Sequence, residues 1–238
     1  MTEPSTGFNF VEAQAHAWEE IRQWQQEAAE QPLIPTKPGG SWDGPGASLD
    51  LTEGLRRALP KLLAERQITS MLDMACGDWN WMRLVDLGGV EYTGWDVDPG
   101  RIERCRWRIT HGDFGTLDRP NAQFEVVNAL TVDEIPYYDL VLARDFLAHL
   151  PIDYIRLVVD KVRAGGSEWL LASTYPGSDN SYKYNPAMYA WLGYLEHPVN
   201  LEIEPINLQK VDAIPEQPGP GGVLTEPHEL GLFLIGNA

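Results

Sequence analysis

A single glycine interrupts the apolar stretch Ser70–Met82, SMLDMACGDWNWM, and an acid and two tryptophans follow it closely. Glycine at the end of a buried strand lets a ligand approach the backbone without meeting a side chain, and it tolerates a positive φ. In sheets of parallel strands, ligands bind where a strand ends and the chain turns toward the next helix. Gly77 therefore marks a candidate ligand-binding corner, with a simple tight turn as the alternative.

The residues around this glycine exclude two common phosphate sites. A dinucleotide site needs G-x-G-x-x-G and a P-loop needs G-K-[ST], whereas this corner reads Ala75, Cys76, Gly77, Asp78. About twenty residues further on, YTGWDVDPG ends a second strand with Asp96, whose carboxylate can accept both hydroxyl protons of a ribose. Asp98 suits the cap of the following helix instead. The pattern favours a nucleoside without phosphates.

Short strand candidates alternate with helices around this corner. This alternation predicts an α/β, doubly wound, Rossmann-like fold with a mostly parallel sheet. The C-terminal part has two more strand candidates without a helix between them, which predicts an antiparallel edge pair. The strand candidates are Ser70–Ala75, Glu91–Val97, Phe124–Leu130, Tyr137–Ala143, Ser167–Thr174, Asn200–Gln209 and Glu229–Gly236, and the helices between them are Pro99–Arg108 and Pro151–Ala164.

The N-terminal part has a different composition. Apolar residues at three- and four-residue steps predict an amphipathic helix over Phe10–Glu30, and a stretch rich in proline and glycine follows it. Residues 1–40 are therefore interpreted as a helix and linker, and residues 41–238 as the main domain. A helix over Ser48–Arg66 is expected to be capped by Ser48 and to kink or restart at Pro60.

Composition narrows the setting and the partners. The chain of 238 residues carries a formal net charge of −17 and has no basic cluster, so nucleic acid is not an expected partner. Its two cysteines, Cys76 and Cys105, are too few for a disulfide framework. The first residues do not have the pattern of a secretory signal, and no window is apolar enough for a membrane span. We expect a cytoplasmic protein without a membrane partner.

Several motifs together resemble the class I S-adenosylmethionine-dependent methyltransferases. The similarity is greatest to a subgroup whose members are often encoded near glycan or natural-product genes and mostly lack an assigned substrate. The motifs occur in the subgroup's order over residues 44–233, and 41–238 would form the methyltransferase domain. They are GPGASL with LRRALPKLL, LDMACGDWNWM, YTGWDVDPGRIE, YYDLVLARDFLAHLP, GSEWLLASTYP, PVNLE and ELGLF.

The resemblance implies S-adenosylmethionine as cofactor and assigns residues to it. Asp73, Gly77 and Asp78 would lie around the methionine end, and Asp96 would bind the ribose. Asn128 stands near the acid that contacts the adenine amino group in the subgroup, and its amide oxygen can accept the same hydrogen bond. Arg144 is also expected to bind the cofactor; alternatively, it orients the methyl acceptor.

The sequence departs from the family pattern at two positions. Ala75 replaces the first glycine of the broader family's motif. His197 precedes PVNLE where the subgroup often has a basic residue, which leaves the acceptor preference open.

Candidate catalytic residues follow the strand that ends at Ala143. His149 is the histidine of the motif ARDFLAHLP, and a neutral imidazole suits a general base toward a hydroxyl. Asp145 is four residues earlier, so the two share a face if the segment is helical. The alternative for His149 is a half-buried structural residue, and Asp145 could instead join a metal site. No cluster with convincing ligand spacing is visible, so no metal is predicted.

These residues predict an O-methyltransferase that acts on a sugar, a glycan or another small hydroxylated metabolite. An N-methyltransferase of a small amine and a non-catalytic binding module are the alternatives, and a nicotinamide dehydrogenase lacks its glycines. Whether the chain forms a homodimer is left open. Aromatic residues near the corner are either platforms for the acceptor or parts of the core; they are Trp79, Trp81, Tyr175, Tyr182 and Tyr184.

Overall fold

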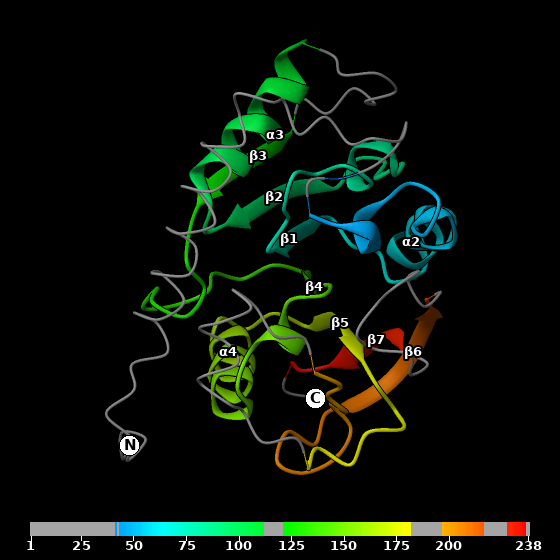
Figure 1. Ribbon diagram of the computed structural model, residues 1–238, viewed down its shortest axis with the longest axis vertical. Coiled ribbons are helices and arrows are strands. Elements are labelled where there is room, and N and C mark those ends of the chain that lie inside the picture. Colours follow the sequence, from blue (N-terminus) through cyan, green and yellow to red (C-terminus); the bar gives the residue numbers. More distant parts are fainter. Residues whose placement is uncertain (1–40, 42, 112–120, 182–196, 217–227, 237–238) are drawn as a thin grey trace.

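The computed structural model describes residues 41, 43–111, 121–181, 197–216 and 228–236. The strands in these ranges form one seven-stranded sheet (Figure 1). The strand order is β3-β2-β1-β4-β5-β7-β6. The predicted helix over Phe10–Glu30 and the rest of residues 1–40 lie outside the described part. The strands are β1 (Ser70–Met74), β2 (Glu91–Asp96), β3 (Ala122–Val126), β4 (Leu140–Ala143), β5 (Trp169–Thr174), β6 (Gln209–Pro215) and β7 (Glu229–Leu234).

The first five strands pair in parallel, and β7 pairs antiparallel with both β5 and β6. This confirms the predicted Rossmann-like sheet with an antiparallel pair at its C-terminal edge. The central strands are buried on both faces, as expected of a parallel sheet covered by helices. Near the amino ends of β1 and β4, Asp139 accepts hydrogen bonds from the backbone amides of Thr69 and Ser70 at 2.8 and 3.0 Å.

Helices cover the two faces of the sheet (Figure 1). Leu72 and Met74 belong to the core cluster that includes α4 (Ile152–Ala164). Met71 belongs to the other cluster, with apolar residues of α2 (Glu53–Glu65) and α3 (Pro99–His111). Because neighbouring side chains of a strand point to opposite faces, the apolar run of β1 supplies both cores.

The expected cap of the first described α-helix was wrong, and so was the alternative of a restart at Pro60. Ser48 accepts hydrogen bonds from the amide and hydroxyl of Thr52 at 3.1 and 2.7 Å in a turn, and α2 begins only at Glu53. The helix also continues through Pro60. Proline inside a helix costs about 3 kcal/mol, and buried leucines on both sides of it offset that cost; they are Leu55, Leu59, Leu62 and Leu63.

The predicted strand over Asn200–Gln209 was also wrong for most of its length. Residues 201–206 form turns, and β6 begins at Gln209. The side-chain amide of Asn200 donates to the carbonyls of Pro176 and Ser178, and the backbone folds back so that Leu208 donates to Leu201 at 2.8 Å. Leu201, Ile206 and Leu208 are buried by this turn rather than by alternation along a sheet, whereas Ile203 is exposed.

The topology gathers several chain segments at one edge of the sheet. Strands β1, β2, β4 and β5 end there, whereas the antiparallel β7 begins there, since Thr174 of β5 pairs with Glu229. Pro215, the last residue of β6, also pairs with Glu229. In the described part of the chain, no helix is long and apolar enough to cross a membrane.

Candidate functional site

The turn after β1 has an unusual backbone. Ala75, Gly77 and Trp79 have φ values of 60°, 57° and 58°. A positive φ is natural for glycine, but it costs about 1–2 kcal/mol for other residues. Strained backbone of this kind is concentrated at functional sites. The corner that the sequence marked with one glycine therefore contains three left-handed residues.

The structure brings Gly77 and Asp96 together. The backbone amide of Gly77 donates to Oδ2 of Asp96 at 3.1 Å, and the amide of Asp98 donates to Oδ1 at 2.8 Å. Asp96 is only 3% exposed, and this burial raises its pKa although Arg101 lies 3.8 Å away. The two backbone amides fix the orientation of the carboxylate at the end of β2. Asp98 caps α3 as expected, because its Oδ1 accepts from the amide of Gly100 at 2.7 Å.

Asp43 covers the same corner and was not predicted from the sequence. Its carboxylate accepts from the backbone amide of Asp78 and pairs with Nε of Arg101 at 2.7 Å. A Cβ built on Gly77 would lie 2.2 Å from Oδ2 of Asp43. Burial raises the pKa of Asp43 to about 7; Arg101 opposes this shift, and Asp78 and Asp96 add to it. A ligand that approaches Gly77 must therefore displace this carboxylate.

Asp78 is buried and holds the corner together. Its Oδ1 accepts from the hydroxyl of Ser41 at 2.8 Å and from the amide of Asn80 at 3.0 Å. The other oxygen lies 3.5 Å from Nη2 of Arg108. The side chain therefore ties Ser41 to the corner and to α3.

Asp73 lies in β1, and Asn128 follows β3, on the other side of β2. Asp73 is buried in β1, where Oδ2 accepts from the hydroxyl of Tyr92 at 2.6 Å. Burial raises its pKa to about 7; the bond to Tyr92 opposes this shift, and Asp96 adds to it. Asn128 follows β3, and its Oδ1 accepts from the amide of Leu130 at 3.0 Å. An amide oxygen can accept a second hydrogen bond, so Asn128 keeps the capacity predicted for it.

Arg144 directs its donors away from the glycine corner. Nη2 donates to the carbonyl of Gly46 at 3.0 Å, Nη1 lies 2.9 Å from Oδ2 of Asp145, and Nε donates to Oε1 of Glu216 at 2.7 Å. Burial opposes the charge, but the two carboxylates raise the pKa of the guanidinium. Arg144 therefore links Gly46 to Glu216 at the end of β6. Its assignment to the cofactor stays a prediction.

Asp145 and His149 do not share an α-helical face, and that expectation was wrong. Residues 144–146 form a turn in which Asp145 has a φ of 50°, and a 3-10 helix, Leu147–His149, follows. The hydroxyl of Ser173 accepts from the amide of Asp145 at 2.9 Å and holds this turn against β5. Burial alone would raise the pKa of Asp145, but the charges of nearby basic groups lower it; they are Arg144, His149 and His228.

His197 lies beside the 3-10 helix. Its backbone amide donates to the carbonyl of Ala148 at 3.0 Å. Burial lowers the pKa of its imidazole to about 4, and the charge of His149 acts in the same direction. The departure noted in HPVNLE thus places a neutral imidazole near His149. A pKa this low makes the imidazole of His197 a weak general base.

Most of the aromatic candidates belong to the core. Trp79 is 1% exposed, and its ring centroid lies 5.0 Å from that of Phe124. Trp81 is buried, with the guanidinium of Arg144 over its ring at 5.6 Å. Tyr175 is buried and stacks on His228 at 5.2 Å. Tyr182 and Tyr184 lie outside the described residues.

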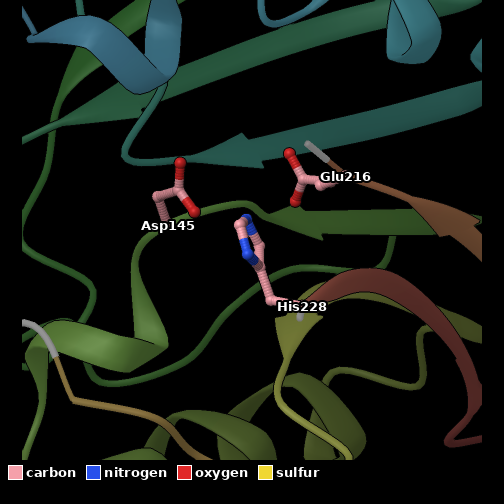
Figure 2. A group of neighbouring side chains, drawn as sticks. All are labelled: Asp145, Glu216 and His228. Carbon is pink, nitrogen blue, oxygen red and sulfur yellow. The ribbon is translucent and has the colours of Figure 1, made fainter. Parts of the chain in front are cut away.

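The ends of β6 and β7 add two residues to the site that the sequence did not predict. Glu216 follows β6 and His228 precedes β7, and the amide of Glu216 donates to the carbonyl of His228 at 3.4 Å. Their side chains point toward Asp145 (Figure 2). Seventy-two residues separate Arg144 from Glu216. The sheet order β4-β5-β7-β6 brings these distant segments to one edge, so spacing along the chain gave no signal.

A cavity of about 370 Å³ lies at the opposite edge of the sheet. Ser70 and Glu91, the first residues of β1 and β2, line it together with Tyr137. Ligands of doubly wound sheets bind at the carboxyl edge. The amino-edge cavity therefore does not identify the site.

No protein-family model matches the chain, and no curated protein matches its sequence. Solved structures match it over most of its length. The N-methyltransferase NodS from Bradyrhizobium japonicum WM9, in complex with S-adenosyl-L-homocysteine, has a TM-score of 0.56 and 17% identity, covering 88% of this chain and 97% of that one. The magnesium protoporphyrin IX methyltransferase ChlM from Synechocystis PCC 6803, with bound SAM, has a TM-score of 0.54 and 12% identity. The match covers 92% of this chain and 96% of that one.

A third match is an O-methyltransferase family 2 protein from Planctomyces limnophilus DSM 3776 in complex with apigenin. It has a TM-score of 0.51 and 17% identity, and covers 76% of this chain and 62% of that one. At such identities the likeness shows the fold alone. The chain has the fold of the class I S-adenosylmethionine-dependent methyltransferases.

Proposed function

We propose that this protein is an S-adenosylmethionine-dependent methyltransferase, with its domain in residues 41–238. The observation that carries the proposal is the hydrogen bond between Gly77 and Asp96, because it joins the ends of β1 and β2 at the carboxyl edge of the sheet. The backbone of Gly77, with the Asp43 carboxylate over it, and the buried carboxylate of Asp96 then lie next to each other. Solved structures of the same fold contain SAM or its demethylated product.

The residues at this corner fit a nucleoside with a charged methionine tail. Asp96 would accept hydrogen bonds from the ribose hydroxyls, and Asn128 would accept one from the adenine amino group. Gly77 gives the methionine portion access to the backbone once Asp43 has moved aside. When bound, the cofactor supplies a methyl group on a sulfonium, so the main tasks of the chain are to align the acceptor and exclude water.

The acceptor is best assigned as a hydroxyl of a sugar, a glycan or another small hydroxylated metabolite. His149 ends the 3-10 helix that follows the turn at Asp145, so it lies at the same edge of the sheet as Asp145. That arrangement suits removal of a proton from a hydroxyl, which remains protonated at neutral pH. An amine acceptor would need this base less. N-methylation is the second candidate, since NodS is an N-methyltransferase of the same fold.

The test is an unbiased search for the acceptor. Wild-type protein and an Asp96→Ala variant are incubated with isotopically methyl-labelled S-adenosylmethionine and with cell extracts that include glycans. We expect label in an O-methyl ether with the wild type and little label with the variant. Label in an N-methyl group would favour the second candidate. Cofactor binding without label in any fraction would favour a binding module that retains the fold.

A further inference from the structure

Three side chains at the carboxyl edge form a group with the composition of a metal site. One oxygen each of Asp145 and Glu216 and one ring nitrogen of His228 lie within 4.8 Å of one another. Figure 2 shows the two carboxylates and the imidazole pointing into the same space from the ends of β4, β6 and β7. Two acids and a histidine that converge from three segments are a common basis for binding a divalent cation.

A second observation points to a ligand between these side chains. The side chain of Glu216 is 2% exposed, and its Oε2 is buried without a hydrogen-bond partner among the described residues. Nδ1 of His228 is also buried without such a partner there. A buried carboxylate oxygen is costly unless it is paired or coordinates a metal.

The surrounding residues hold the group in place without completing it. Arg144 binds one oxygen of each carboxylate, Oδ2 of Asp145 at 2.9 Å and Oε1 of Glu216 at 2.7 Å. Tyr175 stacks on the imidazole of His228 at 5.2 Å and 25°. One arginine offsets one of the two carboxylate charges, so the group keeps a net negative charge when the imidazole is neutral. A divalent cation would reverse that sign.

We propose that Asp145, Glu216 and His228 bind one divalent transition-metal ion, Mn²⁺ or Zn²⁺. The mixed oxygen and nitrogen set favours these ions over Mg²⁺ and Ca²⁺, which prefer oxygen ligands alone. Ligand atoms about 2.0–2.2 Å from one ion stand roughly 3–4 Å apart. The separation of up to 4.8 Å therefore needs shifts of about 1 Å, which side-chain rotations supply.

The ion would have open positions, because a site with three protein ligands keeps room for water or substrate. Asp145 belongs to the turn that leads to His149, so an oxygen of the acceptor suits an open position. This role, but not the binding itself, rests on the proposed methyltransferase function. A metal-bound hydroxyl loses its proton more easily, and His149 would take that proton.

The experiment is a calorimetric titration of the chelator-stripped full chain with MnCl₂ and, separately, with ZnCl₂. We expect one site in the wild type. Loss of an outer-shell partner of a metal site typically costs 10- to 100-fold in affinity, so Glu216→Gln and His228→Ala should each lose at least that. Glu202→Gln and His111→Ala are matched controls outside the group and should bind as the wild type does; Glu202 pairs with Lys210, and His111 stacks on Trp107.

Several results would overturn the metal site. Equal metal affinity in the wild type, Glu216→Gln and His228→Ala would show that these side chains do not bind the ion. A lower melting temperature of Glu216→Gln with unchanged metal affinity would show that Glu216 serves only as the partner of Arg144. If a variant does not fold, the electron paramagnetic resonance spectrum of Mn²⁺ bound to the wild type tests the site instead. The proposal requires that this spectrum show coupling between the Mn²⁺ electrons and an imidazole nitrogen, and absence of that coupling would overturn it. Parallel titration with S-adenosylhomocysteine tests the proposed function separately.

Discussion

The backbone amide of Gly77 donates a hydrogen bond to Oδ2 of Asp96 at 3.1 Å, across the ends of two adjacent parallel strands. This bond makes the glycine corner and the acid at the end of β2 parts of one rigid unit. It also explains why the carboxylate stays oriented although burial raises its pKa.

Ala75→Gly should stabilise the protein by about 1 kcal/mol, because Ala75 has a φ of 60° and glycine adopts that conformation without strain. Urea unfolding of the variant and the wild type measures the difference. Ala64→Gly is the control, since it lies in α2 and should destabilise by about 1 kcal/mol. A destabilised Ala75→Gly variant would show that the turn after β1 is not strained at this residue.

Gly77→Ala should be less destabilising when Asp43 is also replaced by alanine. The added Cβ meets Oδ2 of Asp43, and the strain of a positive φ adds to that clash. A double-mutant cycle by urea unfolding should give a coupling of roughly 1 kcal/mol, within the range of 0.5–3 kcal/mol for residues in contact. Additive effects would mean that Asp43 does not occupy this corner in solution.

His149→Ala should lower turnover on the true acceptor by about 10²–10⁴-fold, the usual contribution of a general base. Affinity for S-adenosylhomocysteine should stay nearly unchanged. The fall of the wild-type rate at acid pH should persist in His197→Gln, since burial keeps the pKa of His197 near 4. Wild-type turnover of His149→Ala, with the acid limb retained, would remove His149 from the chemistry and leave Asp145 as the next residue to test.

Asp73→Asn should stabilise the protein at neutral pH. The folded-state pKa of Asp73 is about 7 against an ordinary value of 3.8, so its stabilising effect is complete below pH 4 and is lost as the pH rises to 7. The amide does not ionise, so the advantage of the variant should grow over that interval and then level off, at most about 4 kcal/mol. Urea unfolding at pH 4.5, 6 and 7.5 measures it. A difference independent of pH would contradict the raised pKa.

The sheet and the corner could be predicted because their determinants are local. The strand candidates include β1, β2, β4 and β5, Gly77 marks the turn after β1, and Asp96 ends β2. The candidate Phe124–Leu130 overlaps β3 only at residues 124–126. The long turn at residues 201–206 could not be predicted, because it depends on hydrogen bonds from Asn200 to the distant residues Pro176 and Ser178. Periodicity alone does not distinguish such a turn from a strand.

The outer parts of the site depend on contacts between distant segments. Asp43 reaches Asp78 from 35 residues earlier in the chain, and Glu216 reaches Arg144 across 72 residues. Neither has a spacing that identifies its partner. The expected α-helical face of Asp145 and His149 failed for another reason, since the left-handed turn at Asp145 replaces the first turn of that helix.

The most direct test of the central claim is a calorimetric titration of the wild type, Asp96→Ala and Asp98→Ala with S-adenosylhomocysteine. An ionised hydrogen-bond acceptor is worth roughly 1.5–3 kcal/mol, so Asp96→Ala should bind about 10- to 100-fold more weakly than the wild type. Asp98→Ala removes only the cap of α3, so it should lower stability and keep its affinity. Wild-type affinity in a folded Asp96→Ala variant, or no binding by the wild type, would contradict the account.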